Sequence, residues 1–528
     1  MTTRRTQITG VVLSAIMVLS MVAFAFAAGA GATTGPSADV ADGAETQGIA
    51  TDSDVLADNL PTETAEIQDN LLDDASDGTV KAVVRVVSPD QSRLTGDRSA
   101  VVDQLKRHAA ITQEPVLDLA SGSGNIEVLN TFWISNAVLV ETDASGLNAL
   151  ADVDVVDRIH SNFEFTQPEV QSGSVDDSDI SKDDVSYGLD QMDVPEARDQ
   201  FDVTGEGVTV AILDSGLSPN HPDIADRFPS DNWAEFDANG NPVNSTPFDN
   251  RGHGTNVGGI VGGSEPADTS IPQYGVAPGV EFYGIKVLDD TGSGTFAQIN
   301  AGLQFVADET DIDIAAMSFG TGAPAPNAIG PINNVVAAGV IPSASIGNSG
   351  AGTSGSPADY YSVLGSGAID SNEQVAPFSA GQNITVSSAF PGAPIPDYWE
   401  DEYLQPDATA AGVGTITAEP SDGYASVSGT SFSQPHKAGV LALMLDALDT
   451  EISGWEDIEP LYDAIRDTAR EPDVSNPPEL PNNRYGHGVV DVPAILNSLD
   501  LGPEVPEFDV GDVNEDGERS IVDAVLVQ

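Results

Sequence analysis

The chain has 528 residues, with 83 Asp and Glu against 19 Lys and Arg and a formal charge of -64. A polyanion of this kind does not bind nucleic acid by neutralising phosphates, and the lack of cysteine excludes disulfides and thiolate metal sites. Acidic residues occur along the whole chain and 40% of residues are hydrophobic, so we expect a folded protein adapted to high salt, which screens the charge. An acidic protein from an ordinary habitat is the alternative.

Residues 1–32 have the order of an export signal. Arg4 and Arg5 precede an apolar run that begins at Val11 and leads into small residues at 27–32. This order predicts a cleaved signal peptide and a secreted protein, and the paired arginines suggest the twin-arginine route. An uncleaved membrane anchor is the alternative, because the run is nearly long enough to span a bilayer.

The next stretch changes from a linker to a small patterned unit. Residues 33–78 are polar, acidic and without sustained periodicity, which predicts a linker. Residues 79–165 alternate strand-like and helix-like segments and predict a small α+β unit. Residues 166–185 are acidic and rich in serine, so we interpret them as a second linker. The predicted strands of the unit are 81–87, 136–141 and 153–159, and its predicted helices are 100–110 and 144–151.

Residues 186–500 show apolar strands that alternate with helices. Strands that are apolar throughout are typical of a parallel sheet covered on both faces, so we predict an α/β fold with a doubly wound, mostly parallel sheet. Ligands of such sheets bind outside the carboxyl ends of the strands, and Asp214 follows the first strand. The predicted strands are 208–213, 282–288, 312–317 and 340–346, with a helix at 295–307.

Three glycine-bearing segments hold an acid, a histidine and a serine. Asp214 stands in Asp-Ser-Gly, His253 in His-Gly-Thr, and Ser431 in Gly-Thr-Ser ahead of a helix-like run to Leu448. A serine hydroxyl becomes a nucleophile when an imidazole removes its proton and a carboxylate orients the imidazole. Taken singly, each residue also fits a turn, a loop or a helix cap.

These segments, in the order Asp, His, Ser, resemble those of the subtilisin-like serine proteases (the subtilase family, S8 type). Together with the acidity of the whole chain, they resemble the halophilic, halolysin-like members of that family. The resemblance runs from about residue 187 to about residue 499. It implies that Asp214 orients, His253 is the general base and Ser431 is the nucleophile of a secreted endopeptidase that forms an acyl-enzyme. A catalytically silent binding or assembly protein of the cell surface is the alternative function, and an acidic esterase is a third.

The resemblance also implies an oxyanion donor and a cleft for protein or peptide substrates. Asn348, in Gly-Asn-Ser, resembles the family's oxyanion donor, whose loss in subtilisins lowers the rate about 10²–10³-fold. Glycines at the edge where an extended peptide pairs leave room for its backbone. The implied substrate-binding residues are Gly292, Ser293, Gly294, Ser318, Phe319 and Gly320.

The segments at either side resemble accessory parts. Residues 79–165 resemble an inhibitor-like propeptide, which implies an intramolecular inhibitor that is cut off between residues 166 and 185. An independent α+β binding domain is the alternative. Residues 501–528 resemble a partial dockerin repeat, which implies a Ca²⁺ loop and a cohesin-type partner, whereas a solvated acidic tail is the alternative. We expect no organic cofactor, and we expect Ca²⁺ in the peptidase domain as well. The implied Ca²⁺ ligands are Asp512, Asn514, Asp516, Glu518 and Asp523.

Overall fold

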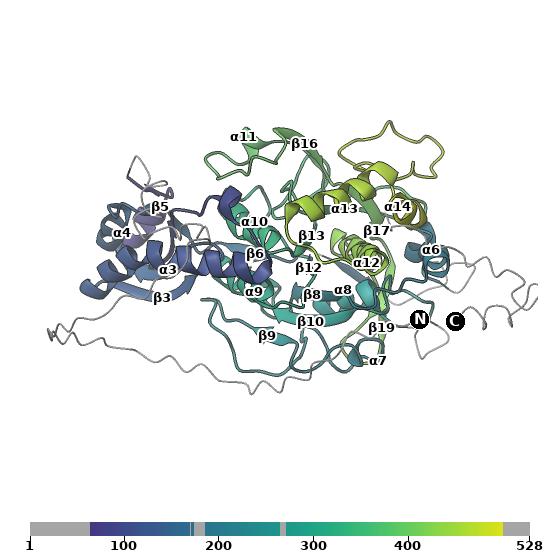
Figure 1. Cartoon of the computed structure of the whole chain (residues 1–528), viewed down its shortest axis with the longest axis horizontal. Helices are drawn as coiled ribbons and strands as arrows, with labels where there is room; N and C mark the ends of the chain where they lie inside the picture. The colour runs from purple at the N-terminus through teal and green to yellow at the C-terminus, as the bar shows by residue number, and fades with distance from the viewer. Residues whose placement is uncertain (1–63, 169, 174–184, 265–270, 500–528) are drawn as a thin grey trace, which may run out of the picture. The chain divides into compact units, whose positions relative to one another are not determined.

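The computed structural model describes residues 64–168, 170–173, 185–264 and 271–499 (Figure 1). The first of these ranges folds into a small α+β unit around a five-stranded sheet with strand order β1-β5-β2-β4-β3. The strands are β1 (Glu66–Ile67), β2 (Val80–Val86), β3 (Ile126–Phe132), β4 (Ala137–Thr142) and β5 (Val156–Ser161), and the helices are α2 (Leu71–Asp74), α3 (Arg98–Gly122) and α4 (Ala144–Ala151), with short 3-10 turns at Ala75–Asp77 and Gln91–Arg93.

The two faces of this sheet pack against different partners because successive side chains of a strand point to opposite faces. Ala82 and Val84 of β2 pack with the apolar side of α4, which includes Leu147. Val83, between them, joins a core that also contains Leu303 of the large unit. The helices α3 and α4 each start at an aspartate whose side chain accepts a backbone hydrogen bond, as is typical of N-caps.

The structure corrects three predictions for this unit. The linker predicted at 33–78 is too long at its end, since residues 64–78 contain β1 and α2 and β1 pairs with β5. The helix predicted at 100–110 runs from 98 to 122, through Pro115, which the pattern treats as a helix breaker. The strand β3 was not predicted, because its sequence is half polar and most of its side chains lie at least partly exposed.

The large unit has a seven-stranded sheet of strand order β17-β14-β13-β12-β8-β10-β9, and every neighbouring pair in it is parallel. The doubly wound α/β prediction is therefore confirmed. Prediction missed the outer strands β9, β14 and β17. The strands are β8 (Thr209–Asp214), β9 (Trp233–Glu235), β10 (Glu281–Lys286), β12 (Ile314–Met317), β13 (Ile341–Ser345), β14 (Leu364–Ile369) and β17 (Ala408–Ala411).

Helices cover both faces of this sheet (Figure 1). Val210 and Ile212 of β8 share a core with residues of α8 and α12, whereas Leu213 shares a core with residues of α9 and α10. This alternation explains why the strand is apolar from Val210 to Leu213. The helices are α5 (Tyr187–Gln191), α6 (Val194–Phe201), α7 (Pro222–Ala225), α8 (His253–Gly262), α9 (Phe296–Asp308), α10 (Ile329–Ala337), α11 (Val386–Ala389), α12 (Thr430–Leu448), α13 (Trp455–Thr468) and α14 (Val492–Ser498), with a 3-10 turn at Pro326–Ala328.

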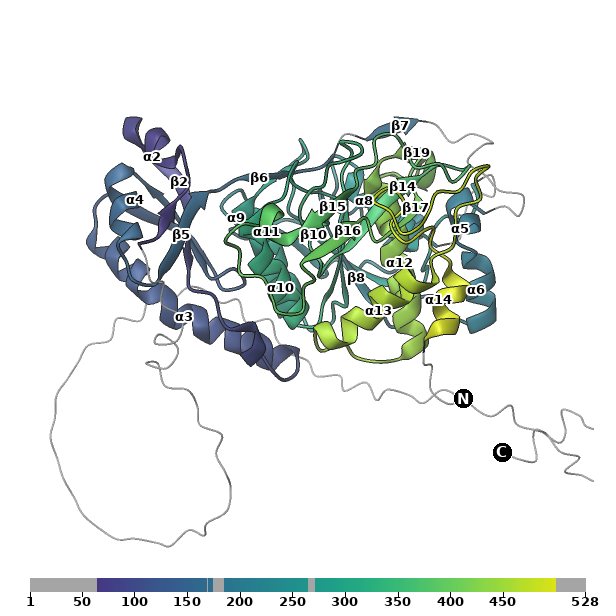
Figure 2. The same cartoon turned by 90° about the horizontal axis from the view of Figure 1, so that it is seen from above.

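Short strands complete the fold, and two of them come from the chain between the units (Figure 2). β6 (Glu164–Thr166) pairs with β11 (Ser293–Thr295), and β7 (Gln171–Gly173) pairs with β19 (Tyr424–Ser428). β19 also pairs with β18 (Thr415–Ala418), and β15 (Gln382–Thr385) pairs with β16 (Glu402–Gln405). In the ranges that the structure describes, no helix is long and apolar enough to cross a membrane.

Candidate active site

Asp214 and His253 meet at the carboxyl edge of the large sheet. Asp214 is the last residue of β8 and His253 the first residue of α8, and both side chains are buried. The His253 Nδ1 lies 2.8 Å and 2.9 Å from the two carboxylate oxygens of Asp214. Ser215 N donates to the same carboxylate at 2.7 Å. This geometry fixes the tautomer that leaves Nε2 of His253 as the proton acceptor.

A second buried carboxylate, Asp249, holds the turn that leads into α8. Its Oδ1 accepts from Gly252 N at 2.8 Å and from the Ser215 hydroxyl at 3.0 Å. Its Oδ2 accepts from the backbone N and the hydroxyl of Thr255, at 2.9 Å and 2.8 Å. The helix can approach β8 this closely because residue 254 is glycine: an added Cβ would lie 1.9 Å from Gly216 O.

Ser431 lies in the first turn of α12, where backbone N–H groups have no acceptor within the helix. Its side chain is buried, and its hydroxyl donates to Ser318 O at 3.3 Å. The ring of the next residue, Phe432, lies 5.5 Å from the His253 ring, which places Ser431 and His253 in one site. Nε2 of His253 is buried and makes no hydrogen bond to any described residue, so the Ser431 hydroxyl does not donate to the imidazole in this structure. Such bonds commonly form only when substrate is bound.

Asn348 follows β13 and contacts the residue before Ser431. Its Oδ1 accepts from both the backbone N and the hydroxyl of Thr430, at 2.9 Å and 2.8 Å. Because the amide oxygen is fixed in this way, the orientation of the amide is defined. Its Nδ2 lies 3.2 Å from the Cβ that an alanine at Gly429 would have, beside the start of α12.

The six residues implied for substrate binding form two edges, and a segment of the chain lies between them. β6 pairs antiparallel with β11, so that Thr166 faces Ser293. On the other side Thr166 and Gly320 exchange two backbone hydrogen bonds, of 2.9 Å and 3.0 Å. Gln167 N then donates to Gly292 O at 2.8 Å. Residues 164–167 therefore occupy both edges as an added strand would.

The side chains of this cleft divide into packing and framework roles. Phe165 of the added strand packs edge-to-face on Phe319, with ring centres 5.9 Å apart. The Ser318 hydroxyl donates to Ser431 O at 2.8 Å, so it supports the first turn of α12. Gly294 is required by its surroundings, because an added Cβ would lie 2.2 Å from Val287 O.

Beyond Ser431 the same segment continues as β7. β7 lies beside β19 (Figure 2) and pairs with it antiparallel, so that Gln171 faces Ser428 and Gly173 faces Ser426. The Val170 side chain approaches Gly429, since an added Cβ there would lie 3.1 Å from its Cγ1. Strand pairings thus flank the site on both sides. The linker predicted at 166–185 therefore includes β7 and the end of β6. These strands were missed because short strands that pair only with distant partners leave no local pattern.

α12 carries two further buried ionisable side chains close to Ser431. His436 Nδ1 lies 2.7 Å from Phe432 O within the helix, and burial lowers its pKa to about 4. The Lys437 ammonium donates to Gly365 O at 2.5 Å and to Ala408 O at 3.1 Å, and burial lowers its pKa to about 7. Both side chains tie α12 to its own turn or to the sheet.

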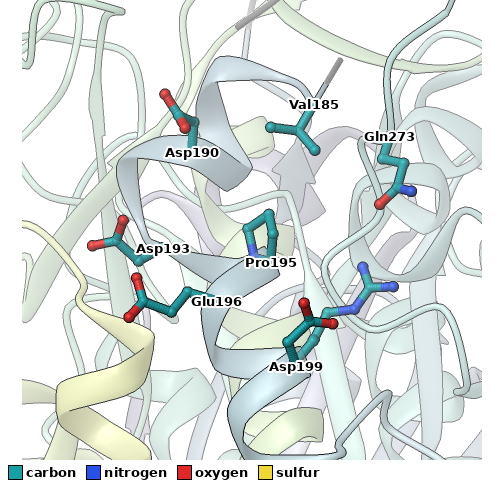
Figure 3. Close-up of a pocket in the computed structure, with 8 residues that line it drawn as sticks. Val185, Asp190, Asp193, Pro195, Glu196, Asp199 and Gln273 are labelled. Atoms are coloured by element: carbon teal, nitrogen blue, oxygen red, sulfur yellow. The ribbon is translucent and has the colours of Figure 1, made fainter. Parts of the chain in front are cut away.

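An acidic pocket of 510 Å³ lies at α5 and α6 and holds none of the residues described above (Figure 3). The pKa of Asp193 is raised there by burial and by Asp491. No group of three or more His, Cys, Asp or Glu suited to a metal ion occurs among the described residues. The predicted Ca²⁺ ligands at 512–523 lie outside those residues. The pocket is lined by Val185, Asp190, Asp193, Pro195, Glu196, Arg198, Asp199 and Gln273.

An acid, a histidine and a serine lie together at the carboxyl edge of a parallel sheet. This arrangement is typical of α/β hydrolytic enzymes that use a serine nucleophile. A model of the subtilase family (peptidase S8) matches residues 205–488, which is more than half of the chain. The chain therefore belongs to the subtilase family, and it is a serine-type endopeptidase.

Several relatives support this assignment. The chain is 35% identical over 319 residues to alkaline elastase YaB of Bacillus sp. (strain YaB), covering 60% of this chain and 71% of that protein. It is 32% identical over 310 residues to subtilisin Savinase of Lederbergia lenta, covering 59% and 98%. Over 458 residues it is 27% identical to bacillopeptidase F of Bacillus subtilis (strain 168), covering 80% of this chain and 30% of that protein.

Proposed function

We propose that this endopeptidase is made as a secreted, salt-adapted precursor and is processed by its own active site. The observation that carries the proposal is the course of residues 164–168 and 170–173. Residues 164–167 pair with both cleft edges before Ser431, and residues 171–173 pair with β19 beyond it. The chain thus presents its own segment to the site as a peptide substrate.

The contacts support one role for each residue. Asp214 orients His253 through Nδ1, and His253 Nε2 takes the proton when the Ser431 hydroxyl turns from Ser318 O toward it. Ser431 Oγ then forms a bond to the carbonyl carbon of the substrate. The negative charge on the carbonyl oxygen is stabilised by Asn348 Nδ2 and by the Ser431 N–H.

The acyl-enzyme follows from the return of the same proton. His253 gives it to the departing amine as the peptide C–N bond breaks, and the acyl group stays on Ser431. A water molecule then attacks the ester carbon, His253 takes its proton, and Ser431 leaves with that proton as the acid product is released. The protein returns to its starting state, so atoms and charge balance.

The small unit is suited to act as an intramolecular inhibitor after the cut. Arg98, at the start of α3, donates to Glu309 O, Ala338 O and Gly339 O, at 2.8, 2.9 and 3.0 Å. These carbonyls end α9 and α10, where the helix dipole favours a cation. We place the processed bond between Gln167 and Val170, with the inhibitor unit at 64–167 in place of 79–165.

The remaining assignments extend this proposal to residues outside the described ranges. Residues 1–32 are a signal peptide for export, with a twin-arginine signal, followed by an acidic linker that ends before residue 64. Residues 501–528 form a Ca²⁺ loop of the dockerin type, which docks on a cohesin-type partner at the cell surface. We also propose Ca²⁺ in the peptidase domain and no organic cofactor.

Replacing the proposed nucleophile tests the proposal. The purified Ser431→Ala precursor, incubated in molar salt, should keep its N-terminal unit attached, whereas the unchanged chain should be cut between Gln167 and Val170. Intact-mass spectrometry reads both outcomes. Ser433→Ala is the matched control, since it removes only a hydroxyl that donates to Thr430 O at 3.0 Å. Cutting of the Ser431→Ala protein at this place at the normal rate would refute the proposal.

A further inference from the structure

Arg251 lies in the cleft beside the segment that occupies it. The residue precedes Gly252 and His253, and its Nε donates to the side-chain Oε1 of Gln167. Gln167 is buried, and its backbone N–H is the one bound by Gly292 O. The Arg251 guanidinium thus contacts the side chain of one position of the bound strand.

No carboxylate neutralises this guanidinium within the described ranges. Asp249 uses Oδ1 to accept from the backbone N of Arg251, not from its side chain. The Asp290 carboxylate is taken by Asn250 at 3.0 Å and by Lys286 at 3.1 Å, and Arg251 reaches only the Asp290 backbone oxygen, at 3.4 Å. One of only 19 basic residues in the chain therefore faces the substrate position without an ion-pair partner among the described residues.

The edge of the cleft gives the guanidinium its place. Gly292 has φ +89, and a Cβ there would lie 2.8 Å from both Cζ and Nε of Arg251. A side chain at 292 would push the guanidinium away from Gln167. The glycine therefore serves the position of Arg251 in addition to its own turn.

We propose that Arg251 determines specificity, selecting an acidic or amide side chain at the substrate position held by Gln167. This inference rests on the proposed function, because it treats the bound segment as a substrate. Glutamate has the shape of glutamine, and its carboxylate makes a charge-assisted hydrogen bond to the guanidinium that is roughly twice as strong as a neutral one. Lysine at this position places two cations in contact.

The overall charge makes this preference distinctive. The full chain has a formal charge of -64, and acidic residues remain in large excess after residue 167, so the long-range field of the mature enzyme attracts cationic peptides. A preference for glutamate over lysine at this one position is opposite to the preference for cations that the overall field produces. The overall field therefore does not account for it. It requires the local cation.

The test uses the mature enzyme and fluorogenic peptides with the sequence of residues 163–173, carrying Gln, Glu or Lys at the position of Gln167. We expect kcat/KM to fall in the order Glu, Gln, Lys, with about five- to tenfold between Glu and Lys in about 0.5 M salt and less in about 3 M. Arg251→Gln should reduce this ratio to below about twofold, and Arg251→Lys should keep its direction at a smaller size. Arg198→Gln, the same change on α6 outside the cleft, should leave the ratio as it is.

Two results would overturn the inference: equal rates for the three peptides with the unchanged enzyme, or an unchanged Glu to Lys ratio in Arg251→Gln. The first can be read even when the variant does not fold. Cleavage of casein by the same enzyme is a further measurement that separates this inference from the proposed function. An enzyme that cleaves casein but does not discriminate among the peptides loses only this inference, whereas an enzyme that cleaves neither casein nor any peptide loses the proposed function.

Discussion

Asp249 shows how one buried carboxylate can set the position of the proposed general base, His253, which it does not touch. It accepts hydrogen bonds from Gly252 N, Thr255 N and the Ser215 hydroxyl, on both sides of His253. Each oxygen faces at least one backbone N–H. An asparagine has one oxygen only, so its NH₂ group would face a donor in either orientation.

We therefore expect Asp249→Asn to lower kcat about 10- to 100-fold with a smaller change in KM. The loss of these hydrogen bonds lets the turn before α8 move, which displaces the His253 imidazole more than the cleft edges. Peptide kinetics on the mature protein measure both constants, and the pH profile of kcat/KM reports the imidazole. Asp231→Asn, at an exposed aspartate, is the matched control. A variant with reduced thermal stability but an unchanged kcat would mean that Asp249 is only structural.

At the scale of the element, α12 combines the proposed nucleophile with a buried cation. The helix begins at Thr430, next to Ser431, and Lys437 lies two turns further along with no exposed surface. The Lys437 ammonium bridges a carbonyl of β14 and a carbonyl of β17, which fixes the helix on the sheet. No carboxylate among the described residues forms an ion pair with this ammonium, and burial of the charge is costly and lowers its pKa from 10.5 to about 7.

This pKa predicts how stability depends on pH. Between pH 7 and 10.5 the unfolded chain binds the Lys437 proton and the folded chain does not, so the free energy of unfolding rises with pH in this window, by about 1.4 kcal/mol per unit. Below about pH 7 both states are protonated and this contribution is constant. Buried tyrosines such as Tyr360 have raised pKa values and lose their protons first in the unfolded chain, near pH 10. They lower the free energy of unfolding there, so the contribution of Lys437 is best measured between pH 7 and 9.

Urea unfolding of Ser431→Ala protein at pH 7, 8 and 9 in constant salt measures this slope without self-digestion. Lys437→Met in the same background should remove most of it, because methionine fills a similar volume and carries no proton. Lys286→Met is the comparison at another buried lysine, which donates to Ser215 O and Leu288 O. The explanation fails if Lys437→Met retains the full slope.

At the scale of the whole molecule, the charge opposes folding unless salt screens it. Most of the described ion pairs have at least one exposed partner, such as Lys106 with Asp308, and exposed pairs contribute little to stability. Against 83 acidic residues, 19 basic ones cannot neutralise the surface. Self-repulsion over the Debye length, about 10 Å at 0.1 M and about 3 Å at 1 M, therefore depends strongly on salt.

We expect near-UV circular dichroism of the Ser431→Ala protein to show fixed tertiary packing in molar salt and to lose it on dialysis to low salt. Sucrose at matched osmolarity is the control, since it favours compaction without screening charge. Identical spectra at both salt concentrations would show that the acidic surface does not make folding depend on salt.

The amino-acid sequence determined those features that depend on neighbouring residues. The run 208–213 is apolar except at Thr209 because β8 is covered on both faces, so the strand and the Asp214 at its end could be predicted. The Gly-Thr-Ser segment ahead of an apolar helix located Ser431 at the start of α12. Short-range pattern was sufficient because each feature lies within a single element.

Only the tertiary structure decided which distant residues meet. The strand β9 has three residues, and β6 and β7 pair with partners far away in the chain, so none leaves a periodic signal of its own. The contact of Arg251 with Gln167 joins residues 84 positions apart. Hydrogen bonds and charge contacts of this kind depend on how the elements pack, and local periodicity carries no record of that packing.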